Sequence, residues 1–167
     1  SRFSMNYNLA FGFRNELELR YAADRDYLQY KKVPRIEDYV NVRTVSSKKI
    51  IREMEESGDP VASVKYYKQT LDFQQKHAEL MKHGNYLAGN GVELEASSPY
   101  VMANGWMTHS GDKLGVLVWN VSDEEVTYNV AYKGYKATAV YAPDKEGVTL
   151  GDTLAAQSLH LVMIEKR

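Results

Sequence analysis

The sequence predicts an α+β protein in which a helical N-terminal half, residues 1–84, is followed by an antiparallel β-sandwich, residues 85–167. Two observations carry this prediction. Apolar residues recur at helical spacing before Gly84, and they alternate at the two-residue period of a strand after Gly91. The boundary between the two patterns carries a cluster of turn-forming residues: Asn85, Gly89, Asn90 and Gly91.

A first helix is predicted over residues 6–28. Apolar residues recur there every four positions: Met5, Leu9, Phe13, Leu17 and Tyr21. Ser4 or Asn6 is expected to cap its start, because their side-chain oxygens can accept the free backbone N–H groups. Gly12 lies inside this stretch, where glycine costs about 1 kcal/mol relative to alanine. A glycine at this place indicates close packing of another element.

Further helices are predicted over residues 35–42, 48–56 and 60–83. The Val33-Pro34 pair separates the first of these from residues 6–28, since proline lacks a donor and restrains its predecessor. The last is the best marked, with Asp59 as N-cap and Pro60 at the first helical position. Gly84 is expected to be the left-handed residue that follows its C-terminus.

Strands are predicted around residues 114–118, 126–132, 137–142 and 159–164. The first and last are apolar on both faces, which is typical of central strands covered on two sides. Trp119 lies at the end of the first strand and is expected in the core. Short, turn-rich connections between the strands favour an antiparallel sandwich.

Composition narrows the kinds of molecule that this protein is expected to bind. The net charge is −1 and the isoelectric point about 6.4, so nothing favours nucleic acid. The sequence has no cysteine, which excludes disulfides, and no apolar run near the roughly 18 residues that span a bilayer. The opening Ser1-Arg2-Phe3-Ser4 is what an internal fragment would show, so the lack of a visible signal peptide leaves localisation open.

No catalytic site, metal site or cofactor is predicted. The four histidines, His77, His83, His109 and His160, lack metal-ligand spacing with one another or with a carboxylate. The acidic residues of the first predicted helix are expected to form solvated or structural ion pairs: Glu16, Glu18, Asp24 and Asp26. The Asn120-Val121-Ser122 triplet fits an N-glycosylation site.

Aromatic residues supply the candidate ligand site. Trp106 lies beside a turn, and an exposed indole there can stack on a sugar ring. With Tyr100 and Tyr86 it would form a carbohydrate platform. The alternative is that Trp106 packs against the helical half.

Several segments together resemble the C-terminal end of bacterial glycoside hydrolases of the α-galactosidase-like type. Phe73 through Leu80, leading to Gly84-Asn85-Tyr86-Leu87, resemble the final helix of a (β/α)8 barrel and its exit. Gly115 through Asn120, with Ser158 through Ile164, resemble the small all-β domain that follows the barrel. Asn8 through Arg14, continuing to Arg20-Tyr21, resemble a late barrel helix.

The resemblance implies a non-catalytic part of a sugar hydrolase. It carries over no catalytic residue, because a barrel of about 250 residues cannot fit in this chain. The chain alone is therefore expected to be inactive, with a missing upstream barrel as its partner and an uncovered apolar face on its first helix. Two alternatives stay open: a carbohydrate-binding module, and a structural domain that dimerises through its helices.

Overall fold

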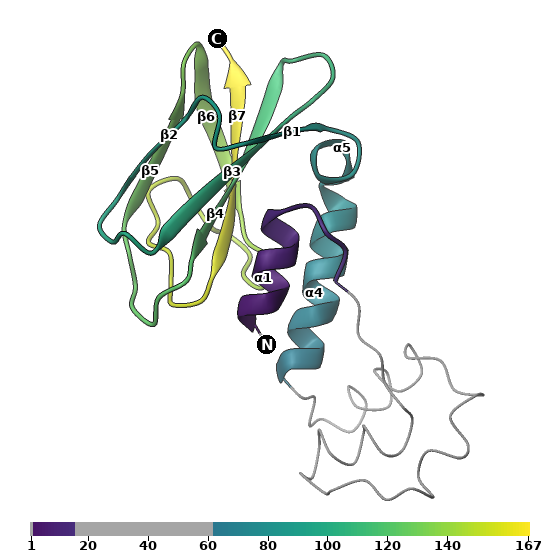
Figure 1. The fold of residues 1–167 in the computed structure, drawn as a ribbon, viewed down its shortest axis with the longest axis vertical. Helices are drawn as coiled ribbons and strands as arrows, with labels where there is room; N and C mark the ends of the chain where they lie inside the picture. The colour runs from purple at the N-terminus through teal and green to yellow at the C-terminus, as the bar shows by residue number, and fades with distance from the viewer. Residues whose placement is uncertain (1, 16–61) are drawn as a thin grey trace, which may run out of the picture. The chain divides into compact units, whose positions relative to one another are not determined.

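The computed structural model describes residues 2–15 and 62–167 (Figure 1). Residues 2–15 and 69–167 belong to one compact unit. The helices of the described chain are α1 (Arg2–Ala10), α4 (Ala62–Lys76) and α5 (Ala78–Met81). Its strands are β1 (Asn85–Ala88), β2 (Val92–Ala96), β3 (Val101–Met107), β4 (Lys113–Asn120), β5 (Tyr128–Tyr132), β6 (Tyr135–Tyr141) and β7 (Leu159–Lys166). None of the described helices is long and apolar enough to cross a membrane.

The strands form two antiparallel sheets. The larger has the order β1-β3-β4-β7-β6, and the smaller pairs β2 with β5. Strand β4 lies at the centre of the larger sheet, where every residue from Leu114 to Asn120 is buried. This confirms the prediction that the segment around residues 114–118 is covered on both faces.

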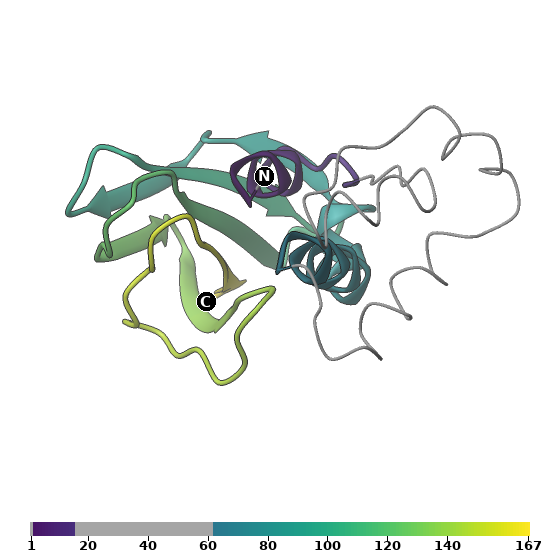
Figure 2. The same cartoon turned by 90° about the horizontal axis from the view of Figure 1, so that it is seen from below.

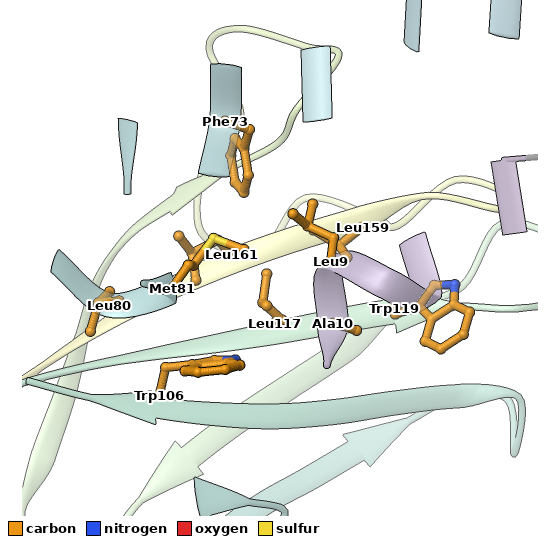
Figure 3. Close-up of a cluster of buried hydrophobic side chains, with 10 residues drawn as sticks. All are labelled: Leu9, Ala10, Phe73, Leu80, Met81, Trp106, Leu117, Trp119, Leu159 and Leu161. Carbon is orange, nitrogen blue, oxygen red and sulfur yellow. The ribbon is translucent and has the colours of Figure 1, made fainter. Parts of the chain in front are cut away.

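Two hydrophobic cores lie on opposite faces of the larger sheet. One lies between this sheet and the helices, and Figure 3 shows its side chains: Leu9, Ala10, Phe73, Leu80, Met81, Trp106, Leu117, Trp119, Leu159 and Leu161. The other lies between the two sheets and holds the alternate residues of β4 and β7, such as Val116, Val118 and Val162. In Figure 2, α1 and α4 are seen end-on beside the strands. The fold is therefore three-layered, with helices, a five-stranded sheet and a two-stranded sheet.

The prediction of a helical N-terminal half is wrong. Strands predominate over helices in the part of the chain that the structure describes, and the N-terminal helical contribution is small. In the described part of the predicted helix over residues 6–28, α1 spans Arg2–Ala10 and ends at Ala10. The rest of that prediction, residues 16–28 with Glu16, Glu18, Asp24 and Asp26, lies outside the described residues. The predicted helices over residues 35–42 and 48–56, together with Asp59 and Pro60, lie outside the described residues.

Gly12 explains why α1 ends early. Its φ of 78° is left-handed, a conformation that glycine adopts without steric cost. The Gly12 N–H donates to the Leu9 carbonyl at 3.1 Å, and the Phe13 N–H donates to the Asn8 carbonyl at 2.7 Å. This pair of bonds is the Schellman motif, which closes a helix. The helix prediction is therefore wrong at Phe13, which lies beyond the end of α1.

The predicted helix over residues 60–83 is confirmed over most of its length, but it is broken. His77 separates α4 from α5, with φ −106° and ψ 31°. Gly84 does not adopt the left-handed conformation that was expected, since it is not among the described glycines with positive φ. A Cβ at Gly84 would instead lie 2.5 Å from the Leu80 carbonyl oxygen and 2.9 Å from that of Met107. The glycine is needed because two backbones approach closely there.

The β-rich C-terminal part is confirmed. Strands β4, β5, β6 and β7 match the four predicted strands, although β5 begins two residues after Val126. Val126 forms an isolated bridge with Leu154 instead. Strands β1, β2 and β3 were not predicted. Strand β1 begins inside the turn cluster at Asn85, and Asn104-Gly105 interrupts the apolar residues of β3. The alternation of β2, Val92-Glu93-Leu94-Glu95-Ala96, is short and was overlooked.

Candidate functional site

Trp106 and Tyr86 lie against each other on neighbouring strands. They are register partners on β3 and β1, with ring centroids 4.7 Å apart. Trp106 is only 7% exposed and belongs to the core beneath the helices (Figure 3). Its ring lies directly under Gly12, where a Cβ would be 2.3 Å from the indole Cη2 atom. Trp106 thus packs against the helical layer, the second of the two alternatives for this residue.

Tyr100 lies away from this pair. It precedes β3 while Trp106 is near the end of that strand, a separation of about 20 Å along an extended chain. Its side chain is 61% exposed. The three residues of the predicted sugar platform are therefore not brought together, and a ligand-binding role for Tyr100 and Tyr86 stays a prediction.

A different set of aromatic side chains does come together, and we call it the aromatic row: Phe3, Tyr7, Phe11 and Tyr86. Consecutive ring centroids along the row are separated by 6.4, 4.7 and 6.5 Å. The first three residues are spaced by four, so they lie on one side of α1 and the turn that follows it. Phe3, Tyr7 and Tyr86 are each between 42% and 47% exposed. The row is therefore a continuous aromatic surface that is half open to solvent.

Two members of the aromatic row pack on the buried Trp119 ring. Phe3 and Tyr7 contact the Trp119 ring at centroid distances of 5.3 and 5.6 Å, and Trp119 is 1% exposed. Burial raises the pKa of Tyr86 above its ordinary value, and the nearby Tyr7 phenol raises it further. The sequence held a signal for this surface in the spacing of positions 3, 7 and 11. That signal was missed, because the helix prediction used the apolar series that begins at Met5 instead.

Buried amides hold α1 in place under the row. Asn104 Nδ2 donates to the Ala10 carbonyl at 2.9 Å, which satisfies one of the free carbonyls at the helix end. Asn6, which is fully buried, donates to the Gln157 carbonyl at 2.8 Å. Asn15 donates to the Met5 carbonyl at 3.1 Å. Such satisfied buried amides fix orientation, because breaking one leaves a polar group without a partner.

The described residues include a buried titratable pair between the two sheets. No group of three or more histidine, aspartate or glutamate side chains in residues 2–15 and 62–167 is placed to hold a metal ion. Tyr128 and His160 form a pair between the two sheets, with Tyr128 Oη 2.8 Å from His160 Nδ1. Burial raises the pKa of Tyr128 and lowers that of His160, so both are held neutral. They satisfy each other and offer no exposed nucleophile.

The asparagine of the predicted glycosylation triplet is buried. Asn120 is 0% exposed, and its Nδ2 donates to the Glu124 carbonyl at 2.7 Å and the Ala155 carbonyl at 3.0 Å. Its Oδ1 accepts from the Ser122 backbone N–H at 3.0 Å. This side chain anchors a turn in the folded protein, and its nitrogen is not accessible to a glycan.

Comparison with protein-family models, curated proteins and solved structures finds no match to this chain. The resemblance to the C-terminal region of α-galactosidase-like hydrolases therefore stays a prediction. Among the described residues, the feature that bears on function is the aromatic row.

Proposed function

We propose that this chain is a non-catalytic, C-terminal part of a bacterial glycoside hydrolase, in which it braces a catalytic barrel. The observation that carries the proposal is the aromatic row on α1. A bracing role requires an apolar face on the first helix that the rest of the chain leaves uncovered. The row has this character within the described chain, since Phe3, Tyr7 and Tyr86 remain nearly half exposed.

The edge of the core beneath the helices supports the same proposal. Leu9 and Ala10 pack into that core against the five-stranded sheet. The Phe3 and Tyr7 rings contact Trp119 at its edge, and both remain nearly half exposed. A contiguous apolar patch on a soluble protein commonly marks an interaction surface.

The partner most consistent with the resemblance is a barrel helix encoded before Ser1. Its apolar side would cover the row and exclude water from the rings, at about 25 cal/mol for each Å² buried. A dimer formed through the same row is the competing arrangement. A carbohydrate-binding module has less support, because Trp106 is buried and Tyr100 lies apart from Tyr86.

The first experiment tests two things together: whether the chain is active, and whether it belongs to a longer hydrolase. The reading frame is followed upstream of Ser1, and the longer product and the 167-residue chain are assayed against a panel of aryl glycosides. We expect hydrolysis only by the longer product. Turnover by the short chain, or a reading frame that starts at Ser1 with no barrel before it, contradicts the proposal.

The second experiment tests the row. Phe3→Ser and Tyr7→Ser are made in both the long and the short protein, with Tyr100→Ser as a control that is exposed but outside the row. We expect the first two changes to destabilise the long protein more than the short one, by about 1–2 kcal/mol. Light scattering on the short chain identifies a dimer. A dimer that these changes dissociate would favour the competing arrangement.

A further inference from the structure

An open cleft lies between one side of α4 and the chain that follows β6, away from the aromatic row. Its volume is about 610 Å³. The helix contributes Asp72, Phe73 and Lys76, and the strand end and following loop contribute Tyr141, Asp144 and Glu146. This volume lies within the range of about 300–1,000 Å³ that small-molecule sites occupy.

The base of the cleft is apolar and includes one accessible aromatic ring. Phe73 lines this part of the cleft and is only 5% exposed, so it forms a fixed apolar surface. The Tyr141 ring is 37% exposed. The His77 ring contacts it at a centroid distance of 4.9 Å, and Lys76 Nζ lies 5.4 Å from its centroid. Tyr141 is thus held in place by its neighbours while part of its surface remains open.

The rim of the cleft is polar and nearly balanced in charge. Asp72, Asp144 and Glu146 supply carboxylates, and Lys76 and Lys145 supply ammonium groups. The loop is tethered to α1 by an ion pair between Arg2 and Asp144. Arg2 Nε also donates to the Gln157 carbonyl at 3.0 Å. The polar groups of the loop are therefore presented on an anchored segment of chain.

The near balance of charge on the rim narrows the class of ligand that the cleft can bind. A phosphate or another anion requires an excess of cationic donors, which this lining does not provide. A metal ion requires convergent carboxylates, and the described residues contain no such group of three. A neutral polyhydroxylated molecule needs acceptors and donors together with an apolar surface for its C–H groups. The rim and the Tyr141 ring offer these features side by side.

We propose that this cleft binds a neutral oligosaccharide. The carboxylates and the Gln69 amide accept hydrogen bonds from sugar hydroxyls, Lys76 donates to them, and the Tyr141 ring packs against the C–H face of one sugar. This inference goes beyond a bracing role, which requires no ligand at all. The cleft has few contacts and is open, so we expect dissociation constants in the range of about 1–10 mM.

The test is a titration of the 167-residue chain with raffinose, maltotriose, cellotriose and xylotriose, followed by saturation-transfer NMR and calorimetry. Sodium phosphate and trialanine serve as an anionic and a peptide comparator. We expect saturable binding of at least one trisaccharide. We expect Tyr141→Ala to weaken that binding about fivefold or more. Phe13→Ala, which alters an exposed aromatic side chain outside the cleft, should leave the affinity unchanged.

Glu146→Gln provides a second variant on an exposed loop position, where folding is not at risk. It should also weaken binding of the trisaccharide. If circular dichroism shows that Tyr141→Ala is unfolded, the affinity of Glu146→Gln alone tests the proposal. The proposal is overturned if no trisaccharide binds saturably, if both cleft variants bind as tightly as the native chain, or if phosphate or trialanine binds in place of the sugars. Such a result leaves the bracing role untouched, because that role is judged by the activity and row experiments.

Discussion

Gly12 combines two constraints at one residue. Its left-handed φ of 78° ends α1, and its missing Cβ leaves room for the Trp106 ring. We expect Gly12→Ala to lower the free energy of unfolding by about 3–4 kcal/mol, from backbone strain and from the clash with the indole. The measurement is urea denaturation followed by circular dichroism.

Gly134→Ala is the matched control for this change. Gly134 has a φ of 87°, yet a Cβ there meets no atom within 4 Å. It should therefore cost only the strain of a left-handed alanine, about 1–2 kcal/mol. Equal losses for the two variants would show that contact with Trp106 is unimportant.

Asn120 offers a second test at the residue scale. Asn120→Asp keeps the size of the side chain but places a carboxylate oxygen against the carbonyls of Glu124 and Ala155. We expect a loss of about 3 kcal/mol or more in stability, because the two carbonyls lose their N–H donor and a buried carboxylate faces them instead. Asn129→Asp, on the exposed side of β5, should change the unfolding midpoint little.

His77 makes stability depend on pH. Burial, with a smaller effect of Lys76, lowers its pKa from 6.5 to about 4. The unfolded chain therefore binds more protons between pH 4 and pH 6.5, and stability falls as the pH is lowered through that window. For this half-buried group we expect a loss of about 1 kcal/mol between pH 7.5 and pH 5, after allowing for solvent screening.

His77→Phe isolates this contribution. The phenyl ring can keep the contacts with Phe73 and Tyr141, which lie 4.6 and 4.9 Å away in the native protein. The variant should lose less stability than the native chain between pH 7.5 and pH 5 in urea titrations. An unchanged difference between the two pH values would contradict the assignment to His77.

At the scale of single elements, β4 carries the largest share of the packing. Leu117 is fully buried on the side that faces the helices, and Leu117→Ala should cost about 3–4 kcal/mol. Leu150 is 48% exposed in the segment between β6 and β7. Leu150→Ala should change stability by no more than about 0.5 kcal/mol. Comparable losses in calorimetric scans of the two variants would refute the central role of β4.

The elements also differ in how well sequence predicts them. Strands β4 and β7 were found because both of their faces are apolar, a pattern that only a doubly covered strand requires. Strand β1 was mistaken for a turn, because it lies beside turn-forming residues and its strand conformation depends on pairing with β3 later in the chain. The end of α1 was missed because helical periodicity does not reveal the φ of Gly12.

The residues of the candidate site also differ in how well the sequence predicts their positions. The burial of Trp119 could be read from its place at the end of an apolar strand. The aromatic row could not be, because Tyr86 joins Phe11 only through the pairing of β1 with β3 and the docking of α1. Contacts between residues about 75 positions apart are set by tertiary packing, which no short window of sequence contains.

At the scale of the whole molecule, the two cores share one sheet. The predicted boundary between residues 84 and 85 stays a prediction, and a fragment of residues 85–167 tests it. We expect this fragment to aggregate or to unfold without cooperativity, because Leu117, Trp119, Leu159 and Leu161 would lose the helices that cover them. Size-exclusion chromatography and near-ultraviolet circular dichroism provide the measurement. A monomeric fragment with a cooperative transition would establish the sandwich as an independent domain.

Strand β7 is the last element of the chain, yet it lies inside the larger sheet, between β4 and β6. Until β7 is in place, β4 and β6 each keep one edge of unpaired backbone groups. The larger sheet can therefore close only after a strand from late in the chain has inserted between two strands made before it.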